Sequence, residues 1–460
     1  MIISIASGIK IYKKLPLSIQ NLIGIILHPI PIRYRGHKKV FKIVNLLVKD
    51  NEYRKDRGKL LRNMIAHAHR NVPFYKEIIG SLEININNSM KIEDIINLPI
   101  ITKETIRNNE KKMIADNFKD FYPGKVKTSG STGVPLEFYI DQDTRIFEYA
   151  SEWRVVVENG GILGSRTATF RGNHYKGNTK IGPHWFTHAL SGELNFNTYS
   201  MGPDACKKYE NKLRRYKPEI YRAFPSSLSH LAKNISGEMI SPNGIAFCSS
   251  EMIDEQIRHD IKQTICPKII NWYSQSEYVV SAGECSQGNM HINLEFGILE
   301  VVDENDINVP DGEIGRLIGT SLTNFSQPFI RYDLEDMGSI EDIKCACGNK
   351  NKILKQISGR RADMLKLPDG RMISTAMMVH WWKHYAVEKW DLDIFDWIQF
   401  IQTTKNKVII NCIPKDQMEV KQDLIEVALS ELWGGEIILV VNIINELPQG
   451  EKWRFCKNEL

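Results

Sequence analysis

Residues 128–136 read TSGSTGVPL, a run of small hydroxyl side chains and glycines that comes directly before the strand-like stretch LEFYI (136–140). Glycine allows backbone N–H groups to approach a ligand closely and tolerates positive φ angles. The short hydroxyl side chains add further hydrogen-bond donors, so the stretch suits a loop that wraps phosphate oxygens. It lacks the Gly-Lys-[Ser/Thr] ending of a Walker A loop. A flexible turn between two strands is the other interpretation of these residues.

The composition is that of an ordinary globular protein with more than one domain. The chain has 460 residues, 42% of them hydrophobic and 25% charged, which allows two or three domains and a large buried core. The net charge is only +5 and no basic tract is interleaved with aromatics, so we expect no nucleic-acid partner. The eight cysteines are mostly scattered, which argues against a disulfide framework and for a cytoplasmic location.

The first 36 residues are apolar and basic. They lack the cleavage site of a signal peptide, and IQNLIGIILHPIPI (19–32) is too short and too interrupted by prolines to span a membrane. We expect an amphipathic segment that packs on the body of the protein. Loose peripheral contact with the inner membrane surface is the second interpretation.

Hydrophobic patterning predicts an α/β fold. EYRKDRGKLLRNMIAHAHRNV (52–72) has helical spacing and should stop at PFY (73–75). From about residue 125 to 340, strand-like runs alternate with helix-like stretches, which indicates a large body of mixed sheets and helices. These runs are TATFRG, IYRAFP, GIAFCSS, KIINWYS, FGILEVV and GRLIGTSL.

A small α+β domain is expected at the C-terminus. SGRRADMLKLPDGR (358–371) is turn-rich and typical of a linker. After it come a hairpin (396–413), a helix (416–434) and a strand (436–444). We therefore expect an N-terminal helical segment (1–90) packed on the body, a large body (91–358) and a small mobile lid domain (359–460).

Five further motifs follow the glycine-rich loop, and their order carries a family resemblance. They are SSE (249–251), WYSQSE (272–277), IRYDLEDMG (330–338), GRRADML (359–365) and LPQGEKWR (447–454). In this order the set resembles the adenylate-forming superfamily and, within it, the phenylacetate–CoA ligase family, whose phosphate loop TSGSTGVP closely matches. The resemblance runs from about residue 60 to the end. HAHRNVPFY (67–75) and the residues before it look like the branch associated with capsule and O-antigen genes.

The resemblance implies an AMP-forming acid–thiol ligase. Such enzymes activate a carboxylic acid with ATP and Mg²⁺, release pyrophosphate, and transfer the acyl group from the adenylate to coenzyme A; here the setting would be cell-surface polysaccharide biosynthesis. Donors and a cation must neutralise the charge that gathers in the first step. Two alternatives stay open: transfer of the acyl group to a sugar amine, and a non-catalytic nucleotide-binding component of polysaccharide assembly. Related enzymes are often homodimers.

The resemblance also implies roles for individual residues. The β- and γ-phosphates would be held by Ser129, Gly130, Ser131, Thr132 and Gly133, the adenine would be bordered by Ser250 and Glu251, and Tyr273 and Ser274 would lie along the adenine and the α-phosphate. Glu277 would ligate Mg²⁺, and the ribose would be bound by Arg360 and by Asp336, with Asp333 as a rival. Asp363 would form the pivot of the lid. A surface helix cap is the other interpretation of Glu277.

The adenylation lysine matches the family least well. Lys452 is the candidate and Lys457 the second choice, because Glu451 interrupts the Gly-Lys pair that the family usually shows. The acid itself is not disclosed, and aromatic, hydroxy and amino acids all stay open. We expect residues 170–230 to line its pocket, where His174 and Tyr175 could touch the substrate.

Four residues have the spacing of metal ligands. Cys345 and Cys347 form a C-x-C pair, and Cys285 and His291 form a C-x₅-H pair upstream. Some members of the resembled family bind zinc through this pattern, and a closed four-ligand site would be structural. Separate local roles for the four groups are the alternative. The other cysteines, at 206, 248, 266, 412 and 456, should lie in the core.

Overall fold

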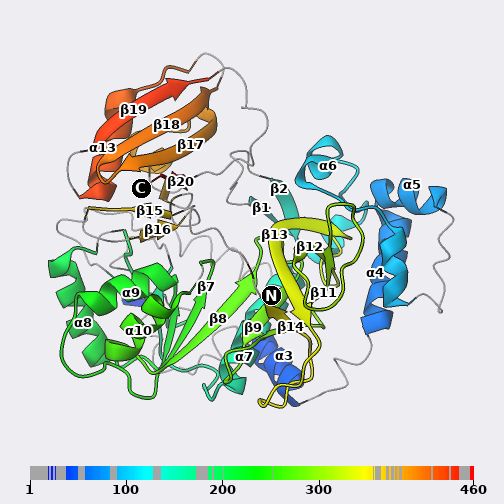
Figure 1. Cartoon of the computed structure of the whole chain (residues 1–460), viewed down its shortest axis with the longest axis horizontal. Coiled ribbons are helices and arrows are strands. Elements are labelled where there is room, and N and C mark those ends of the chain that lie inside the picture. Colours follow the sequence, from blue (N-terminus) through cyan, green and yellow to red (C-terminus); the bar gives the residue numbers. More distant parts are fainter. Residues whose placement is uncertain are drawn as a thin grey trace.

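One large sheet organises the body of the protein (Figure 1). The computed structural model describes residues 38–49, 57–82, 91–127, 136–171, 185–188, 191–199, 201–251 and 253–355, with shorter stretches between 357 and 459 and a few positions near the N-terminus. The strands of this sheet are β3 (Thr167–Phe170), β4 (Trp185–Thr187), β5 (Leu194–Phe196), β6 (Ile220–Ala223), β7 (Ile245–Ser249), β8 (Lys268–Ser274), β9 (Ser281–Glu284), β10 (Met290–Ile292), β11 (Gly297–Val302), β12 (Gly315–Ser321), β13 (Tyr332–Glu341) and β14 (Ile353–Lys355). Within the described residues their order is β11-β12-β13-β14-β10-β9-β8-β7-β6-β3-β5-β4.

One half of this sheet is parallel. Strands β5, β3, β6, β7 and β8 pair in parallel in that order, as in a doubly wound α/β fold. Helices cover both faces: α8 (Pro203–Tyr216), α9 (Pro225–Lys233) and α10 (Glu255–Thr264) pack on one, and α7 (Gln142–Glu158) with α3 (Lys38–Lys49) on the other. Strands buried on both faces read as continuous apolar runs, and β7 (IAFCS) is buried at every position. The strands predicted from such runs are confirmed.

The other half is antiparallel and shares its core with the N-terminal helices. Strands β8, β9, β10, β14, β13, β12 and β11 pair antiparallel in that order. The core beneath them is built from residues 61–140 and 279–354, with no member from the parallel half between them. The hairpin of β1 (Gly124–Lys127) and β2 (Glu137–Ile140), the helix α6 (Lys103–Asn108) and the 3₁₀ turns Ile92–Asn97 and Phe118–Phe121 complete this part.

Helices α4 (Arg57–Asn71) and α5 (Pro73–Ser81) form the predicted helical region, with one difference. The buried face of α4 consists of Leu61, Met64, Ile65 and Ala68, the spacing of an amphipathic helix. The expected stop at PFY is confirmed, because α4 ends at Asn71, but Pro73 also begins a second helix. Proline is well tolerated in the first turn of a helix, where its missing N–H has no helical partner.

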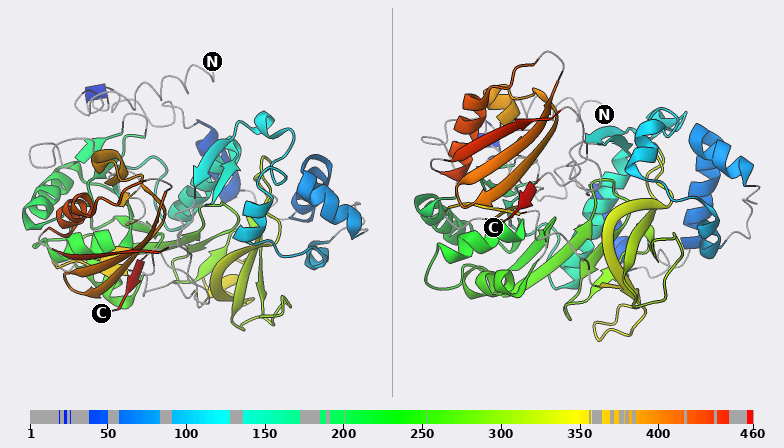
Figure 2. Two further views of the ribbon diagram at one scale, coloured as in Figure 1. Left: turned by 90° about the horizontal axis from the view of Figure 1, so that it is seen from above. Right: turned by 45° about the horizontal axis from the view of Figure 1, so that its top comes forward.

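The C-terminal part has its own sheet and core (Figure 2). Within the described residues its sheet has the order β19-β18-β17-β20, formed by β17 (Phe395–Thr404), β18 (Lys407–Pro414), β19 (Ile438–Ile443) and β20 (Cys456–Asn458). Helix α13 (Gln422–Trp433) packs on this sheet, and α12 (Val387–Trp390) lies beside α13. The predicted hairpin, helix and strand are confirmed, although the helix begins at Gln422. The expected linker contains a short strand, β15 (Met364–Lys366), which pairs with β16 (Met372–Ser374).

The five cysteines predicted to lie in the core, at 206, 248, 266, 412 and 456, are all buried. In the part of the chain that the structure describes, no helix combines the length and apolarity needed to cross a bilayer. The predicted membrane contact concerns residues 1–36, which lie almost entirely outside the described residues.

Candidate active site at the carboxyl ends of the parallel strands

The ends of β7 and β8 carry four of the predicted nucleotide-binding residues. Ser250 and Glu251 follow β7, and Tyr273 and Ser274 end β8, its parallel neighbour. In open α/β sheets, ligands bind outside the carboxyl ends of parallel strands. Ser250 has a φ of 71°, a left-handed conformation that is uncommon for a serine and concentrates at functional sites. The structure therefore brings these four residues to the edge where a ligand is expected.

Glu251 is held in place from a third strand end. Its carboxylate accepts the backbone N–H of Ser226 at 2.9 Å and the Ser226 hydroxyl at 3.0 Å. Ser226 lies in the first turn of α9, directly after β6. The turn after β7 is thus tied to the neighbouring strand-to-helix turn, which limits its movement.

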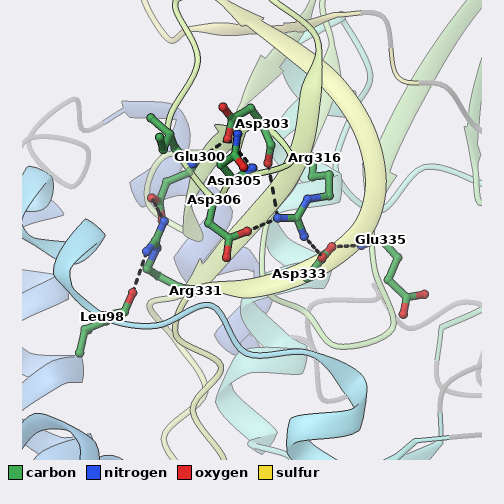
Figure 3. A network of polar contacts seen from close by, with 10 residues as sticks. Leu98, Glu300, Asp303, Asn305, Asp306, Arg316, Arg331, Asp333 and Glu335 are labelled. Carbon is green, nitrogen blue, oxygen red and sulfur yellow. Dashed lines mark hydrogen bonds and ion pairs between the residues drawn. The ribbon is translucent and has the colours of Figure 1, made fainter.

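Asp336 and Asp333, the two rivals for the ribose role, have different surroundings. The hydroxyl of Tyr273 donates to Oδ2 of Asp336 at 2.9 Å, which places Asp336 beside the end of β8. Asp333 instead accepts from Nη1 of Arg316 at 2.6 Å and from the backbone N–H of Glu335 at 2.7 Å (Figure 3). Asp333 is thus engaged in holding the β-structure, whereas Asp336 faces the candidate site.

Glu277 is buried, so the interpretation as a surface helix cap is wrong. Its side chain is 6% exposed, and Oε1 accepts the hydroxyl of Tyr332 at 2.7 Å. Burial and the nearby carboxylate raise the pKa of Tyr332 well above its ordinary value, so the phenol remains a donor at neutral pH. The hydrogen bond orients one carboxylate oxygen and leaves the other side of the group for a second partner.

A buried arginine that sequence reasoning missed fixes the start of β13. Arg331 has a φ of 49° and donates to the carbonyl oxygen of Ile96 at 2.9 Å. It also donates to the carbonyl oxygen of Leu98 at 2.7 Å (Figure 3). Its guanidinium also pairs with Glu300, at 3.1 Å. These contacts hold a left-handed residue next to Tyr332, and so determine where the tyrosine that bonds Glu277 is placed. The motif IRYDLEDMG contains Arg331, and this was the signal that could have found it.

The four predicted metal ligands lie together. One ligand atom from each of Cys285, His291, Cys345 and Cys347 lies within 4.8 Å of the others. The Sγ atoms of Cys285 and Cys345 are 3.8 Å apart, and Nε2 of His291 is 3.3 Å from Sγ of Cys347. Three sulfurs and one imidazole nitrogen at this separation fit a tetrahedral Zn²⁺ site.

The surroundings of these four residues also suit a metal. Nδ1 of His291 bonds the carbonyl oxygen of Asn351 at 2.9 Å, which fixes the tautomer that leaves Nε2 as the ligand atom. Backbone N–H groups of Gln287 and Asn349 donate to Sγ of Cys285 and Cys347, each at 3.4 Å, as expected around thiolates. Cys285 lies in the turn after β9, His291 in β10, and Cys345 and Cys347 in the loop between β13 and β14, so a bound ion would join two segments far apart in sequence.

A charged cluster was also missed. Glu148 and Glu152 on α7, Arg171 after β3 and Arg222 in β6 lie between α7 and the parallel strands. A charge inside an apolar strand run, as in IYRAFP, is unusual in a core and was the available signal. Arg171 and Arg222 fall within residues 170–230, where the acyl pocket is expected.

Several predicted residues lie outside the described residues: Ser129, Gly130, Ser131, Thr132, Gly133, His174, Tyr175, Arg360, Asp363 and Lys452. The strands on either side of the glycine-rich stretch are described, and Lys127 of β1 pairs with Glu137 of β2. Lys457, the second choice for the adenylation lysine, lies in β20 with Nζ 2.9 Å from Glu459.

Comparisons with known proteins agree with this arrangement, although no protein-family model matches the chain. The chain is 24% identical to Protein CapK of Staphylococcus aureus over 98% of this chain and 99% of that protein. It is 24% identical to the phenylacetate-coenzyme A ligase of Thermus thermophilus over 66% of this chain and 69% of that one. Among solved structures, 2-hydroxyisobutyryl-CoA ligase with 2-HIB-AMP and CoA superposes with a TM-score of 0.57 and 18% identity, over 89% of this chain and 90% of that one. The likeness shows that the chain has the fold of an adenylate-forming ligase.

Proposed function

Since the chain is a member of the phenylacetate–CoA ligase family, in the branch of CapK, we propose that it activates a carboxylic acid with ATP and transfers the acyl group to coenzyme A. The observation that carries the proposal is that Glu277 and Asp336 both lie close to Tyr273 at the end of β8. One is held by Tyr332 and the other by Tyr273, at the strand ends where a nucleotide is expected.

The nucleotide would lie across this edge of the sheet. Asp336 would accept hydrogen bonds from the ribose hydroxyls, with Tyr273 fixing its orientation. Ser250 and Glu251 would border the adenine, and Ser274 would lie near the α-phosphate. Arg360, outside the described residues, would add a contact to the ribose.

The first half-reaction gathers negative charge. A carboxylate oxygen of the acid attacks the α-phosphorus of ATP, the bond between that phosphorus and the bridging oxygen breaks, and pyrophosphate leaves. Glu277 would ligate the Mg²⁺ that neutralises the phosphates, because Mg²⁺ favours one or two carboxylates together with phosphate oxygens. The loop from Ser129 to Gly133 would hold the β- and γ-phosphates. Lys452 would place an ammonium between the carboxylate and the α-phosphate.

The second half-reaction transfers the acyl group. The thiolate of coenzyme A attacks the acyl carbon of the adenylate, and AMP leaves with the electrons of the broken C–O bond. We propose that residues 359–460 form a lid that turns about Asp363 between the two steps, on a body of residues 91–358 with residues 1–90 packed against it. A pivot must absorb a large backbone change, which favours a loop position.

The Cys285, His291, Cys345 and Cys347 group would bind Zn²⁺ in a structural role, since all four positions of a tetrahedron would be filled by protein. It would hold the turns of the antiparallel half rather than act on substrate.

The cellular role is proposed from the relation to CapK. We propose that the acyl group serves cell-surface polysaccharide biosynthesis from the cytoplasm, in a homodimer whose N-terminal segment contacts the inner membrane surface. Transfer of the acyl group to a sugar amine is a second candidate within the same adenylation chemistry. A non-catalytic nucleotide-binding role is a third, and the interrupted Gly-Lys pair at Glu451 favours it.

The test is exchange of labelled pyrophosphate into ATP, with pooled carboxylic acids, Mg²⁺ and no acceptor. Exchange that depends on one pool is the expected result, and coenzyme A and amino sugars added in turn would then identify the acceptor. Normal ATP binding without exchange from any pool, in folded and zinc-loaded protein, would favour the non-catalytic role.

A further inference from the structure

The charged cluster, formed by the buried Glu148, Glu152 and Arg222 and the half-buried Arg171, lies beside the candidate nucleotide site. Residues 148 and 152 are one helical turn apart and share a face of α7. In β6, Arg222 lies opposite Phe247 of β7 in the parallel ladder, and both point to the face that α7 covers. Arg171 follows β3 directly, at the carboxyl edge of the same sheet.

Two members of the cluster satisfy one another. Arg222 hydrogen-bonds Oε2 of Glu152, and both side chains are buried. The guanidinium of Arg222 also lies 5.0 Å from the ring centre of Tyr149 and 5.5 Å from that of Phe247. The charges of Arg222 and Glu152 therefore balance each other, and the pair holds a fixed position beside Arg171 and Glu148.

The other two members have hydrogen-bonding atoms that the protein does not use. Arg171 reaches Glu152 only at 3.7 Å through Nη1, and its buried Nε and Nη2 have no hydrogen-bond partner in the part of the chain that the structure describes. Glu148 accepts from Nε1 of Trp272 at 3.3 Å through Oε1, while its buried Oε2 is likewise unpartnered. Buried polar atoms without partners destabilise a protein, so a ligand that supplies the partners is favoured.

The charges around these atoms select the kind of ligand. Nε and Nη2 form one edge of the guanidinium, two parallel donors that match an oxygen acceptor or the two oxygens of a carboxylate. Burial, with the nearby charge of Glu152, raises the pKa of Glu148 to about 8, so at neutral pH this group is mostly protonated and can donate as well. An ammonium group would instead meet the positive charge of Arg171 and a largely neutral acid.

The position of the cluster relates it to the reacting carboxylate. Ser274, which ends β8 and is assigned to the α-phosphate, lies close to the carboxyl group of Glu148, and its buried Oγ is also without a hydrogen-bond partner among the described residues. Arg171 and Ser274 also emerge at the same edge of the sheet, after β3 and at the end of β8. An acid whose carboxylate is at the α-phosphate would therefore extend its acyl chain toward Arg171.

We infer that the acid bears an oxygen substituent on its acyl chain, a hydroxyl or a second carboxylate, which accepts hydrogen bonds from Arg171 beside Glu148. The inference rests on the proposed carboxylate activation and deepens it by naming the substrate class. It places unsubstituted aliphatic and aromatic acids, and acids with an ammonium group, among the poor substrates.

The experiment compares matched acids in the pyrophosphate exchange assay. There is one set for each chain length from three to six carbons. Each set contains the unsubstituted acid and its hydroxyl-, carboxylate- and amino-substituted forms, and phenylacetate is added as an aromatic acid. We expect the best hydroxyl- or carboxylate-substituted acid to exceed its unsubstituted counterpart in kcat/KM by at least about tenfold, the value of one hydrogen bond to a charged group. The ratio between the hydroxyl and carboxylate sets identifies the substituent.

Arg171→Met should remove this preference, and Arg166→Met is the matched control. Arg166 stands at the other end of β3, about half exposed and 3.9 Å from Glu219. We expect the preference to fall at least about tenfold in Arg171→Met and to be unchanged in Arg166→Met. If Arg171→Met does not fold, Arg171→Lys, which keeps the charge but loses the paired donors, should still weaken the preference.

The outcomes separate this inference from the function it rests on. Exchange that is strongest with unsubstituted, aromatic or amino acids would leave the proposed function standing and overturn the inference. The inference would also be overturned if the preference for oxygen-bearing acids survived in Arg171→Met or, should that variant not fold, in Arg171→Lys. Absence of exchange with every acid, in folded protein, would contradict the proposed function itself.

Discussion

Replacing Tyr332 by phenylalanine should weaken Mg²⁺ use without disturbing the fold around it. The change deletes one hydroxyl, which donates to the buried Glu277 at 2.7 Å, and keeps the ring that packs 5.2 Å from Phe329. A hydrogen bond to a charged group contributes about 2 kcal/mol. At 1.4 kcal/mol per tenfold, the Mg²⁺ concentration for half-maximal pyrophosphate exchange should rise about 30-fold.

The assay is a titration of exchange with Mg²⁺ at fixed ATP, and Tyr75→Phe provides the control. The hydroxyl of Tyr75 is also buried, donates to the carbonyl oxygen of Pro328 and accepts the N–H of Ile330, both at 3.1 Å. Both variants should melt at a lower temperature than the parent, but only Tyr332→Phe should change the Mg²⁺ dependence. The same Mg²⁺ dependence in both variants would refute the assignment of Glu277 as a metal ligand oriented by Tyr332.

Five further substitutions test other parts of the site. Asp336→Asn should raise the KM for ATP at least about tenfold, whereas Asp333→Asn should lower the melting temperature and leave this KM unchanged; the reverse pattern would exchange their roles. Cys347→Ser should abolish stoichiometric zinc, measured by metal analysis of the purified protein, and a zinc content equal to the parent's would reject the site. Burial raises the pKa of Glu148 from 4.5 to about 8, so its protonated form stabilises the fold below pH 4.5, and this stabilisation is lost as the pH rises through 8. In urea unfolding, the free energy of unfolding of Glu148→Gln should therefore rise by about 4 kcal/mol relative to the parent between pH 5 and pH 9. Parallel pH curves for the two proteins would contradict this. Lys452→Ala should lower exchange at least about a hundredfold in folded protein, and exchange at the parent rate would exclude this lysine.

Local patterns predicted the elements of this fold well, because a strand that is buried on both faces, such as β7, has a continuous apolar sequence. Pro73 correctly marked the end of α4, but proline also favours the first turn of a helix, and the start of α5 at the same residue was not predicted. The short strand β15 lay in a charged, turn-rich stretch whose pairing with β16 no local pattern reveals.

The motifs predicted individual residues of the candidate site but not their contacts with one another. Motif order identified Tyr273 and Glu277, but their partners lie 63 and 55 residues away, and no local spacing indicates that they meet. Asp333 and Asp336 could not be ranked by motif alone, and the bulge between them, where Glu335 has a φ of 60°, breaks the regular alternation of side chains along β13.

The charged cluster was hidden for a different reason. Glu148 and Glu152 have the spacing of an ordinary solvated helix face, and only the packing of α7 against the sheet shows that they are buried.

The core shared by residues 61–140 and 279–354 has a consequence for synthesis. When Ile140 leaves the ribosome, the apolar faces of α4, α5 and β2 still lack their partners from the antiparallel half, which is complete only roughly two hundred residues later. At the usual rate of elongation this is a delay of about 10 to 40 s. Chaperones should therefore engage the nascent chain early, and a stall within the parallel half would release a fragment with its first core exposed.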